Sequence, residues 1–420
     1  MKTKILAILI VGLMVRFALA LVSGHPYDMA IWANYQRLFY SAGILDFRYF
    51  PTLPIIYYMQ LASYSFYAFL VDAGLHDPQL FYHTTYMIEG VFLKLPMILA
   101  DLGVFLLLIR ASKPFAAALY FLNPFLIYLS GAWGTYDSIM IFFLVAGFLA
   151  LEKSKRLIAT SLFTVSGLVK LFGLVPLALV LIESIYRRRF KEFFLQLAIF
   201  GLFSTIIFSP LVIQGGAQNF FSGFALRFIG LSSAQTRSWN FFAAIQGSSY
   251  GGAPPFIWLA YVSIPIAFVL QIRRTNSSFL PVLQLCLIGA VLLNVFSQGE
   301  PQWLSWPIPL ALMYASATNR QGLQIFSYSF GAIATFLVMT LTQGTGYLLF
   351  GLLYTSYLAP LEGFARTLPV YAITTLSLLL LLTTYTLRKP VKFRFEVIAL
   401  VLIIYCQAYF WFSIVGIQNL

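Results

Sequence analysis

The chain is predicted to be an all-α polytopic membrane protein, and three features of its sequence support this fold class. Of its 420 residues, 60% are hydrophobic and only 9% are charged, and the mean hydropathy is +0.87. Apolar stretches follow one another along almost the whole chain, separated by short polar or basic joints. A helix that crosses a bilayer needs about 20 apolar residues, and many of these stretches approach that length. A soluble domain of this composition could not cover its surface with polar groups.

The net charge of +13 does not indicate a nucleic-acid partner, because the basic residues form no patch with interleaved aromatic side chains. Both cysteines, Cys286 and Cys406, lie in apolar segments and predict neither a disulfide framework nor a metal site. The first 24 residues resemble a secretory signal, but Arg16 interrupts the apolar core and further spans follow. We therefore expect an uncleaved first helix.

We expect thirteen transmembrane helices in a single domain of residues 1–420, with a cytoplasmic N-terminus because Lys2 and Lys4 precede the first helix. The expected spans are 4–22, 86–109, 115–131, 138–151, 157–169, 171–186, 193–212, 256–271, 279–296, 303–318, 323–341, 369–387 and 396–414. This assignment places most of the 26 basic residues on the cytoplasmic side, which is the positive-inside pattern.

Three outward regions are too long for simple turns, namely 23–85, 213–255 and 342–368. The first is rich in aromatic residues and predicts helices that lie on or dip into the membrane interface. The second is a loop whose length and aromatic content favour a packed, functional segment.

A hairpin is expected between the basic clusters at 152–156 and 187–191, since both clusters favour the cytoplasm. The two arms, 157–169 and 171–186, are short for full crossings. The bend, near Gly167, Lys170 and Gly173, is expected to stop in the outer leaflet. A single long tilted helix is the alternative.

Eight basic residues oppose the topology rule, because they lie on the expected outer side or at helix ends. They are Arg16, Arg37, Arg48, Lys94, Lys170, Arg227, Arg237 and Arg366. Charged groups at membrane depth cost free energy to desolvate and therefore commonly serve a site.

Asp28, in the segment GHPYDMA at 24–30, stands at the outer end of the first expected helix. A partly desolvated carboxylate there suits general-base catalysis. The alternative is a helix N-cap that accepts backbone N–H groups, and the two are compatible. Trp32, Tyr35 and Phe39 form an aromatic stripe if a short helix starts after Pro26.

Five further motifs follow Asp28 in a characteristic order. They are FRYFPTLP (47–54), KLPMILAD (94–101), LYFLNPFLIYLSGAWGTYDSI (119–139), GLVKLFGLVPLAL (167–179) and EPQWLSWPIPL (300–310). Together they resemble the GT-C membrane glycosyltransferases, and within them the polyprenol-phosphate-mannose-dependent mannosyltransferases of the GPI mannosyltransferase I branch and its prokaryotic relatives. The resemblance covers roughly residues 1–310, and 311–420 would add C-terminal helices.

The resemblance implies a GT-C type bundle with interfacial helices in the first extracytoplasmic loop. It also implies a hexosyltransferase of glycolipid biosynthesis that uses a polyprenyl or dolichyl phosphate mannose donor and a lipid or glycan acceptor, with Asp28 as the base. The outer-side cations available for the donor phosphate are Lys94, Lys170, Arg48, Arg227 and Arg237. Candidate sugar or acceptor contacts are Asp137, Tyr136, Gln302 and Trp303.

Structural alternatives exist for several of these residues. Lys94 could extend to the interface, and Arg227 and Arg237 could bind lipid headgroups. Asp137 could cap the helix that starts at Ser138. Asp101 could neutralise Lys94 or another buried cation. Trp303 and Trp306 could belong to an aromatic belt or form a sugar platform.

The sequence departs from the family pattern at two places. GPI-type relatives carry two acids separated by one residue, and here the partner position is Pro26. A lone carboxylate gives a divalent cation one anchor, so no metal or other cofactor is expected. His25 could add a ligand, but a turn-capping or hydrogen-bonding histidine is favoured. The arginine often found before Gly134 is replaced by Trp133.

Two other functions compete with transfer. A lipid-linked-sugar flippase or secondary transporter predicts inverted repeats and charges near the midplane, whereas here the unusual charges gather at one expected face. An inactive scaffold subunit is the third, and Asp28 argues against it. The expected location is a prokaryotic, by preference archaeal, cell membrane with the site facing outside.

Overall fold

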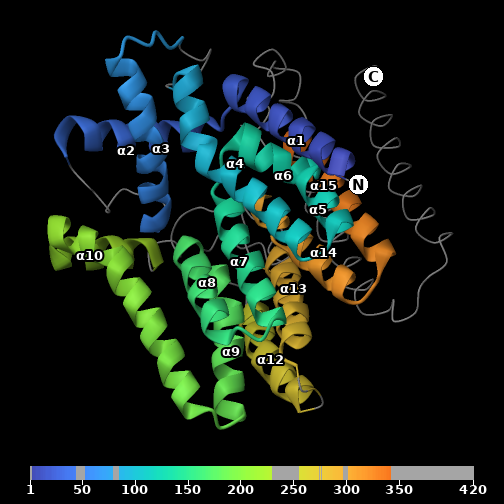
Figure 1. The fold of residues 1–420 in the computed structure, drawn as a ribbon. Helices are drawn as coiled ribbons and strands as arrows, with labels where there is room; N and C mark the ends of the chain where they lie inside the picture. Colours follow the sequence, from blue (N-terminus) through green and yellow to red (C-terminus); the bar gives the residue numbers. More distant parts are fainter. Residues whose placement is uncertain are drawn as a thin grey trace, which may run out of the picture.

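The computed structural model describes residues 2–43, 53–78, 85–228, 255–273, 275, 277–296 and 301–341, and helices dominate these ranges (Figure 1). The first four are α1 (Lys2–Val22), α2 (Pro26–Ala42), α3 (Pro54–Asp72) and α4 (Met87–Arg110). Then come α5 (Pro114–Phe121), α6 (Pro124–Ile127), the π-helical turn η1 (Tyr128–Trp133) and α7 (Asp137–Glu152). The next are α8 (Arg156–Val169), the 3₁₀ turn η2 (Leu171–Gly173), α9 (Leu174–Tyr186) and α10 (Phe190–Phe228). The last are α12 (Pro255–Ile272), α13 (Phe279–Phe296), the 3₁₀ turn η4 (Pro301–Ser305), α14 (Pro307–Ala317) and α15 (Gln321–Leu341).

From the first span to 323–341, each expected span falls on one or more of these helices, and the largest difference is at 193–212, where α10 continues to Phe228. Among the described residues, three helices are long and apolar enough to cross a membrane alone, in Thr3–Val22, Met87–Arg110 and Phe190–Gln214. The pair Pro114–Phe121 and Pro124–Trp133, bent by 51°, makes a fourth candidate. Several other helices are apolar but shorter than the ~20 residues of a full crossing. The expected spans at 369–387 and 396–414 and the region 342–368 lie outside the described residues.

One boundary was predicted wrongly. The loop expected at 213–255 begins inside α10, which continues to Phe228. Pro210 and the polar, glycine-containing stretch after it favoured a helix end. A helix interrupted by proline persists in apolar surroundings when neighbouring groups satisfy the freed backbone carbonyl.

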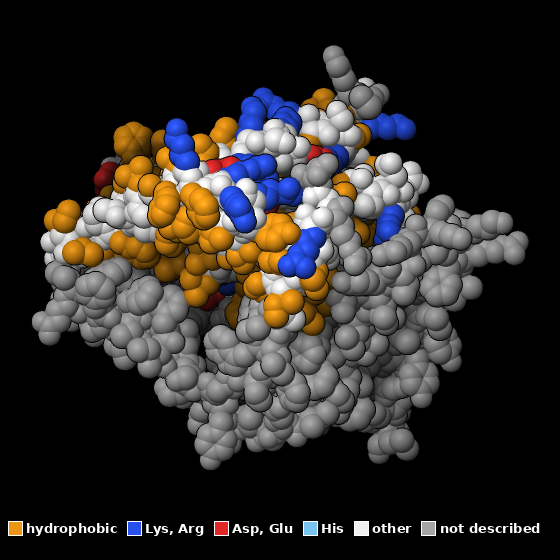
Figure 2. Space-filling view, turned by 90° about the horizontal axis from the view of Figure 1, so that it is seen from below, with side chains coloured by type: hydrophobic (Ala, Val, Ile, Leu, Met, Phe, Trp, Pro, Cys, Tyr) orange, Lys and Arg blue, Asp and Glu red, His pale blue; other side chains and the backbone are white. Residues whose placement is uncertain are grey.

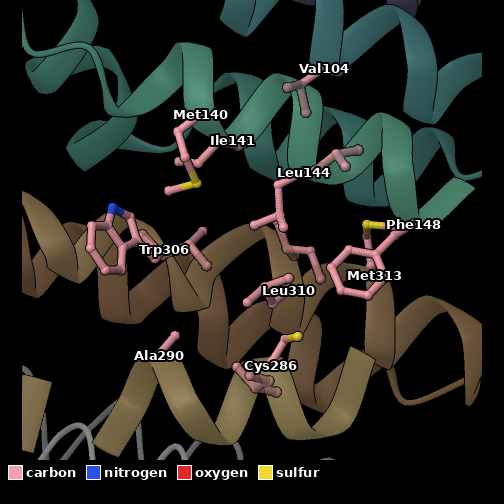
Figure 3. Close-up of a cluster of buried hydrophobic side chains, with 14 of the residues drawn as sticks. Val104, Met140, Ile141, Leu144, Phe148, Cys286, Ala290, Trp306, Leu310 and Met313 are labelled. Carbon is pink, nitrogen blue, oxygen red and sulfur yellow. The ribbon is translucent and has the colours of Figure 1, made fainter. Parts of the chain in front are cut away.

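Helix α7 forms the centre of the core. Figure 3 shows its side chains Met140, Ile141, Leu144 and Phe148 directed toward α14 and α13, with α4 close to the same helix. All four of these side chains are fully buried. Helices α8 and α4 make the most extensive contacts with α7. Because α7 has 16 residues, it spans about 24 Å between its two ends.

The expected hairpin between α8 and α9 is confirmed. Gly173 lies against the backbone of α8, where a Cβ would be 2.4 Å from the backbone nitrogen of Gly167. At the open end of the hairpin, the Arg156 guanidinium pairs with Glu183 at 2.6 Å. Lys170 lies at the bend between the two helices, in an extended backbone conformation.

The basic joints gather at the end of the bundle opposite this bend. Lys113 pairs with Glu152 at 2.9 Å, which brings the turn after α4 beside the turn after α7. Arg187, after α9, donates to the backbone carbonyl of Thr275 at 2.8 Å. Figure 2, a view of the molecule from below, shows many Lys and Arg side chains on this face. Among the described residues, the basic turns after α4, α7, α9 and α12 therefore lie on one side, as expected.

A buried ion pair joins α1 to α4. The Arg16 guanidinium and the Asp101 carboxylate are both fully buried, with Nη2 and Oδ2 3.1 Å apart. Ser130 and Tyr120 add hydrogen bonds to this pair. Asp101 thus neutralises a cation inside the bundle, as one interpretation of the sequence held, and that cation is Arg16 rather than Lys94.

Helices α2 and α3 confirm that the first outward region is helical. Arg37 of α2 donates from Nε to Glu89 of α4 at 2.9 Å, and Tyr64 of α3 donates to the same carboxylate at 3.0 Å. Asp77 accepts the backbone N–H groups of Ile88 and Glu89 and so caps α4. The buried carboxylate of Glu89 therefore holds both α2 and α3 on α4.

We predict that Gly173→Ala lowers the thermal unfolding midpoint of the detergent-solubilised protein, because the new methyl group meets backbone atoms that cannot rotate away. Gly201→Ala is the matched control, since nothing lies within 4 Å of a Cβ at Gly201 in α10. Alanine is the better helix former by about 1 kcal/mol, so the control should be neutral or stabilising. Equal behaviour of the two variants would contradict the close contact between α8 and α9.

Candidate active site

Asp28 lies in the first turn of α2, and its carboxylate points back toward η1. The indole Nε1–H of Trp133 donates to Oδ2 of Asp28 at 2.6 Å. The Asp28 side chain is 25% exposed, so it can reach a substrate from outside the bundle. Among the described residues, no hydrogen bond or ion pair reaches Oδ1. Trp133 therefore holds Oδ2, and Oδ1 is available to a substrate.

The N-cap of α2 is His25, which corrects the alternative that Asp28 fills this position. Nδ1 of His25 accepts the backbone N–H of Asp28 at 3.3 Å. The imidazole also stacks on the Trp133 ring, with centroids 4.8 Å apart and an interplanar angle of 14°. Because the histidine satisfies the backbone, the Asp28 carboxylate is not needed as a cap.

Lys170 and Asp137 form a second charged pair. Nζ of Lys170 is 2.9 Å from Oδ1 of Asp137, with the lysine side chain 12% exposed and the aspartate fully buried. Trp306 Nε1–H donates to the same Oδ1 at 2.6 Å, and Thr135 donates to Oδ2 at 2.8 Å. The buried carboxylate therefore anchors an ammonium group that retains some contact with the exterior.

Three aromatic rings surround the Lys170 ammonium. Nζ lies 5.0 Å from the ring centroid of Tyr136, 5.1 Å from that of Trp306 and 5.8 Å from that of Trp303. Trp303 stacks on Trp306 at 5.0 Å, and Trp306 stacks on Phe172 at 4.8 Å. Ring faces attract a cation, so the cage adds to the hold of Asp137 on Lys170.

The segment Trp133–Asp137 joins the two charged groups, because its first residue holds Asp28 and its last holds Lys170. Five residues span at most about 18 Å, so both groups lie in one region of the surface. Gly134 turns the chain at φ +86, and a Cβ there would be 2.7 Å from Met29 and 3.1 Å from Lys94. Only glycine fits this left-handed, crowded position.

Lys94 lies directly beneath the Asp28 turn and is fully buried. Its ammonium donates to the backbone carbonyls of Ala20, at 3.2 Å, and Ser23. These carbonyls belong to the end of α1, where the helix dipole favours a cation. The alternative that Lys94 extends to the interface is wrong, because the side chain has no exposed surface. Direct contact between Lys94 and a donor phosphate stays a prediction.

Some of the remaining predicted site residues lie near Lys170, and the side chains of the others lie outside the described part of the structure. Tyr136 and Trp303 line the Lys170 cage, and Gln302, nearly buried, precedes Trp303 in η4. Arg48 and Arg237 lie outside the described residues, and Arg227 lies in α10 with its side chain not described. Substrate contacts by Asp137, Tyr136, Gln302 and Trp303 stay predictions, and full burial leaves Asp137 to act through Lys170.

The comparison with solved structures finds the crystal structure of ArnT from Cupriavidus metallidurans bound to undecaprenyl phosphate, with a TM-score of 0.50 over 91% of this chain and 76% of that chain. The chain has a GT-C type fold. At 15% sequence identity, the likeness shows the fold alone. No family model and no curated protein matches the chain. The protein is accordingly an all-α, multi-pass membrane protein.

Within the GT-C fold, sequence reasoning missed two partners of the predicted site. Trp133 was recognised only as a departure from the family's arginine, yet its N–H holds the candidate base. Trp306 was expected in an aromatic belt or sugar platform, yet its N–H holds Asp137. Both residues belong to the quoted motifs, but an indole N–H gives no sequence signal for the carboxylate that it binds.

That no metal acts at Asp28 stays a prediction, and the described residues near Asp28 supply few metal ligands. In the part of the chain that the structure describes, no group of three or more His, Cys, Asp or Glu side chains is placed to hold an ion. Asp28 has His25 as its nearest possible co-ligand, and Nδ1 of that histidine already accepts a backbone N–H. A divalent cation requires more oxygen ligands than this turn supplies.

We predict that Asp137→Asn destabilises the protein by about 3 kcal/mol, because it removes the buried carboxylate that binds the Lys170 ammonium. Glu152→Gln removes the carboxylate of the more exposed Lys113 pair and should cost less than about 1 kcal/mol. Thermal unfolding in one detergent compares the two variants. A smaller loss for Asp137→Asn than for Glu152→Gln would contradict the buried pair.

Proposed function

We propose that the protein transfers mannose, or a related hexose, from a polyprenyl or dolichyl phosphate to a lipid or glycan acceptor. The observation that carries this proposal is the Trp133–Asp137 segment, which holds a partly exposed carboxylate and a partly exposed ammonium in one region. The fold supports it, because ArnT, of similar fold, was crystallised with undecaprenyl phosphate. A lipid phosphate is a ligand for which a cation near a membrane surface is suited.

In the proposed reaction, the acceptor hydroxyl attacks the anomeric carbon while Asp28 takes its proton. The bond between the anomeric carbon and the phosphate oxygen breaks, and the electron pair leaves with the lipid phosphate. This departing monoester needs neutralisation of its charge, which Lys170 supplies at the ammonium held by Asp137 and the aromatic cage. A single displacement inverts the configuration of the sugar.

The proposal needs no metal, since the base is a lone carboxylate and the leaving group is balanced by a lysine. It also places the site outside the cell, in a prokaryotic and by preference archaeal membrane. The basic turns lie at the opposite end of α7 from Asp137, and basic turns favour the cytoplasm.

The experiment that tests this function incubates the purified protein with radiolabelled polyprenyl phosphate sugars and a membrane lipid extract. Transfer yields a product with a new glycosidic bond, whereas a flippase or transporter yields none. A mannose donor is expected to give the most product. Absence of product with every donor would reject the function.

We predict that Asp28→Asn abolishes product formation while donor binding stays within a few-fold, because the amide cannot accept the proton. Trp133 can still donate to the amide oxygen of the variant, so the local structure should persist. Donor binding is measured with the same labelled lipid. Retained turnover would remove Asp28 as the base.

We predict that Lys170→Ala weakens donor affinity much more than Lys155→Ala. Lys155 is an exposed lysine in the turn between α7 and α8, at the other end of the bundle. Salt should weaken donor binding to the Lys155 variant and to the wild type alike, since both retain the Lys170 cation. Equal effects of the two substitutions would contradict the phosphate assignment.

A further inference from the structure

Among the described residues, the side-chain contacts of the Asp28 carboxylate fall on one of its two oxygens. Oδ2 accepts the Trp133 indole N–H at 2.6 Å and lies 3.3 Å from Nδ1 of His25. The His25 ring is stacked on the same indole, and the His25 backbone N–H donates to the Trp133 carbonyl at 3.2 Å. Trp133 therefore fixes both the carboxylate and the histidine beside it.

The protonation state of His25 follows from the hydrogen bond that its Nδ1 accepts. Nδ1 accepts the Asp28 backbone N–H, and a ring nitrogen can accept only when it carries no proton. A proton on Nδ1 would abolish that cap and turn the nitrogen into a donor 3.3 Å from Oδ2. The carboxylate would then be engaged by a cation instead of standing ready to take a proton.

We propose that Trp133 and neutral His25 form a positioning clamp on Asp28, in which Trp133 donates to Oδ2 and His25 accepts the Asp28 backbone N–H, so that Oδ1 is left for the acceptor hydroxyl. Protonation of His25 breaks the backbone bond and pairs the imidazolium with Oδ2, which undoes the clamp. This inference rests on the proposed function, because it assigns roles within the same transfer reaction. Trp133 and His25 are positioning residues that act through Asp28. They give the turn a dependence on the protonation of a histidine, in addition to the dependence on the protonation of the carboxylate itself.

The charges around His25 agree with the neutral form. In the described structure, the nearby charged groups are Asp28 of α2 and Lys94 of α4, whose ammonium binds the carbonyl of Ser23. Trp133 and Tyr128 of η1 carry no charge. Burial lowers the pKa of His25, and Asp28 partly offsets this effect. His25 is thus neutral at pH 7, and the clamp is lost as the pH falls through a pKa below the ordinary 6.5.

The first test is Trp133→Phe, which keeps a ring for the stack on His25 but removes the N–H donor. A hydrogen bond to a charged group corresponds to about a 10- to 100-fold effect, and we expect that loss in kcat. The donor KM should stay within a few-fold, because Lys170 is untouched. Tyr128→Phe, a change in a ring that packs on Trp133 at 6.0 Å, is the control and should turn over normally.

The second test is His25→Asn, read as a pH profile. Asparagine is a good N-cap and can accept the same backbone N–H, so the helix start should be retained, and the readout is the shape of the profile of kcat/KM against pH. The wild type should lose kcat/KM as the pH falls through the lowered pKa of His25, and in the variant this loss should disappear or begin at lower pH. His76→Asn, at a histidine in the turn after α3, should keep the wild-type profile.

The outcomes separate the clamp from the function on which it rests. Product formation by the wild type together with an unchanged kcat in Trp133→Phe overturns the clamp and leaves the transfer reaction standing. A His25→Asn profile identical to that of the wild type also overturns it. If Trp133→Phe does not yield folded protein, the His25→Asn profile decides. Absence of product with the wild type rejects the function itself.

Discussion

The cost of burying a charge without a partner governs how the first half of this protein is arranged. Removing an ion from water costs several kcal/mol unless an opposite charge or several hydrogen bonds replace the lost hydration. Arg16 meets Asp101, and Glu89 meets Arg37, in each case between segments far apart in the sequence. Each pair joins a helix to α4, so the pairing of charges also specifies the packing of helices.

The candidate site combines a buried, paired carboxylate with two charged groups that keep some exposure. Asp137 is buried and its two carboxylate oxygens have partners, but Lys170 and Asp28 keep some exposure. Lys94, fully buried, is satisfied by backbone carbonyls at the end of α1. A charged group that buried partners fix in place, and that keeps an exposed side, is pre-organised for a ligand, because little rearrangement is needed when charge develops there. This is the structural basis of the proposed transfer.

The Trp133–Asp137 segment unites the geometry because it lies where η1 ends and α7 begins. At this junction the chain leaves one helix through a left-handed glycine and enters the central helix of the core. Core packing along α7 therefore fixes Asp137, and hydrogen bonding at the end of η1 fixes Asp28. The opposite end of α7 meets the basic turns, so the length of one helix separates the site from these turns.

The sequence by itself determined the helical class, the approximate helix positions and the basic turns. The length of an apolar stretch and the positions of its flanking charges are local properties, and they decide how a segment interacts with a bilayer. It also singled out Lys170, as a cation that opposes the topology rule, and Asp28, as an acid at the outer end of the first expected helix, because both features are visible without a fold. It did not reveal that Arg16 is the partner of Asp101, or that His25 rather than Asp28 caps α2. It placed a loop where α10 continues. Only the tertiary structure decided which indole N–H meets which carboxylate, because these partners lie 105 and 169 residues apart and hydrogen-bond geometry between distant segments leaves no trace in local pattern.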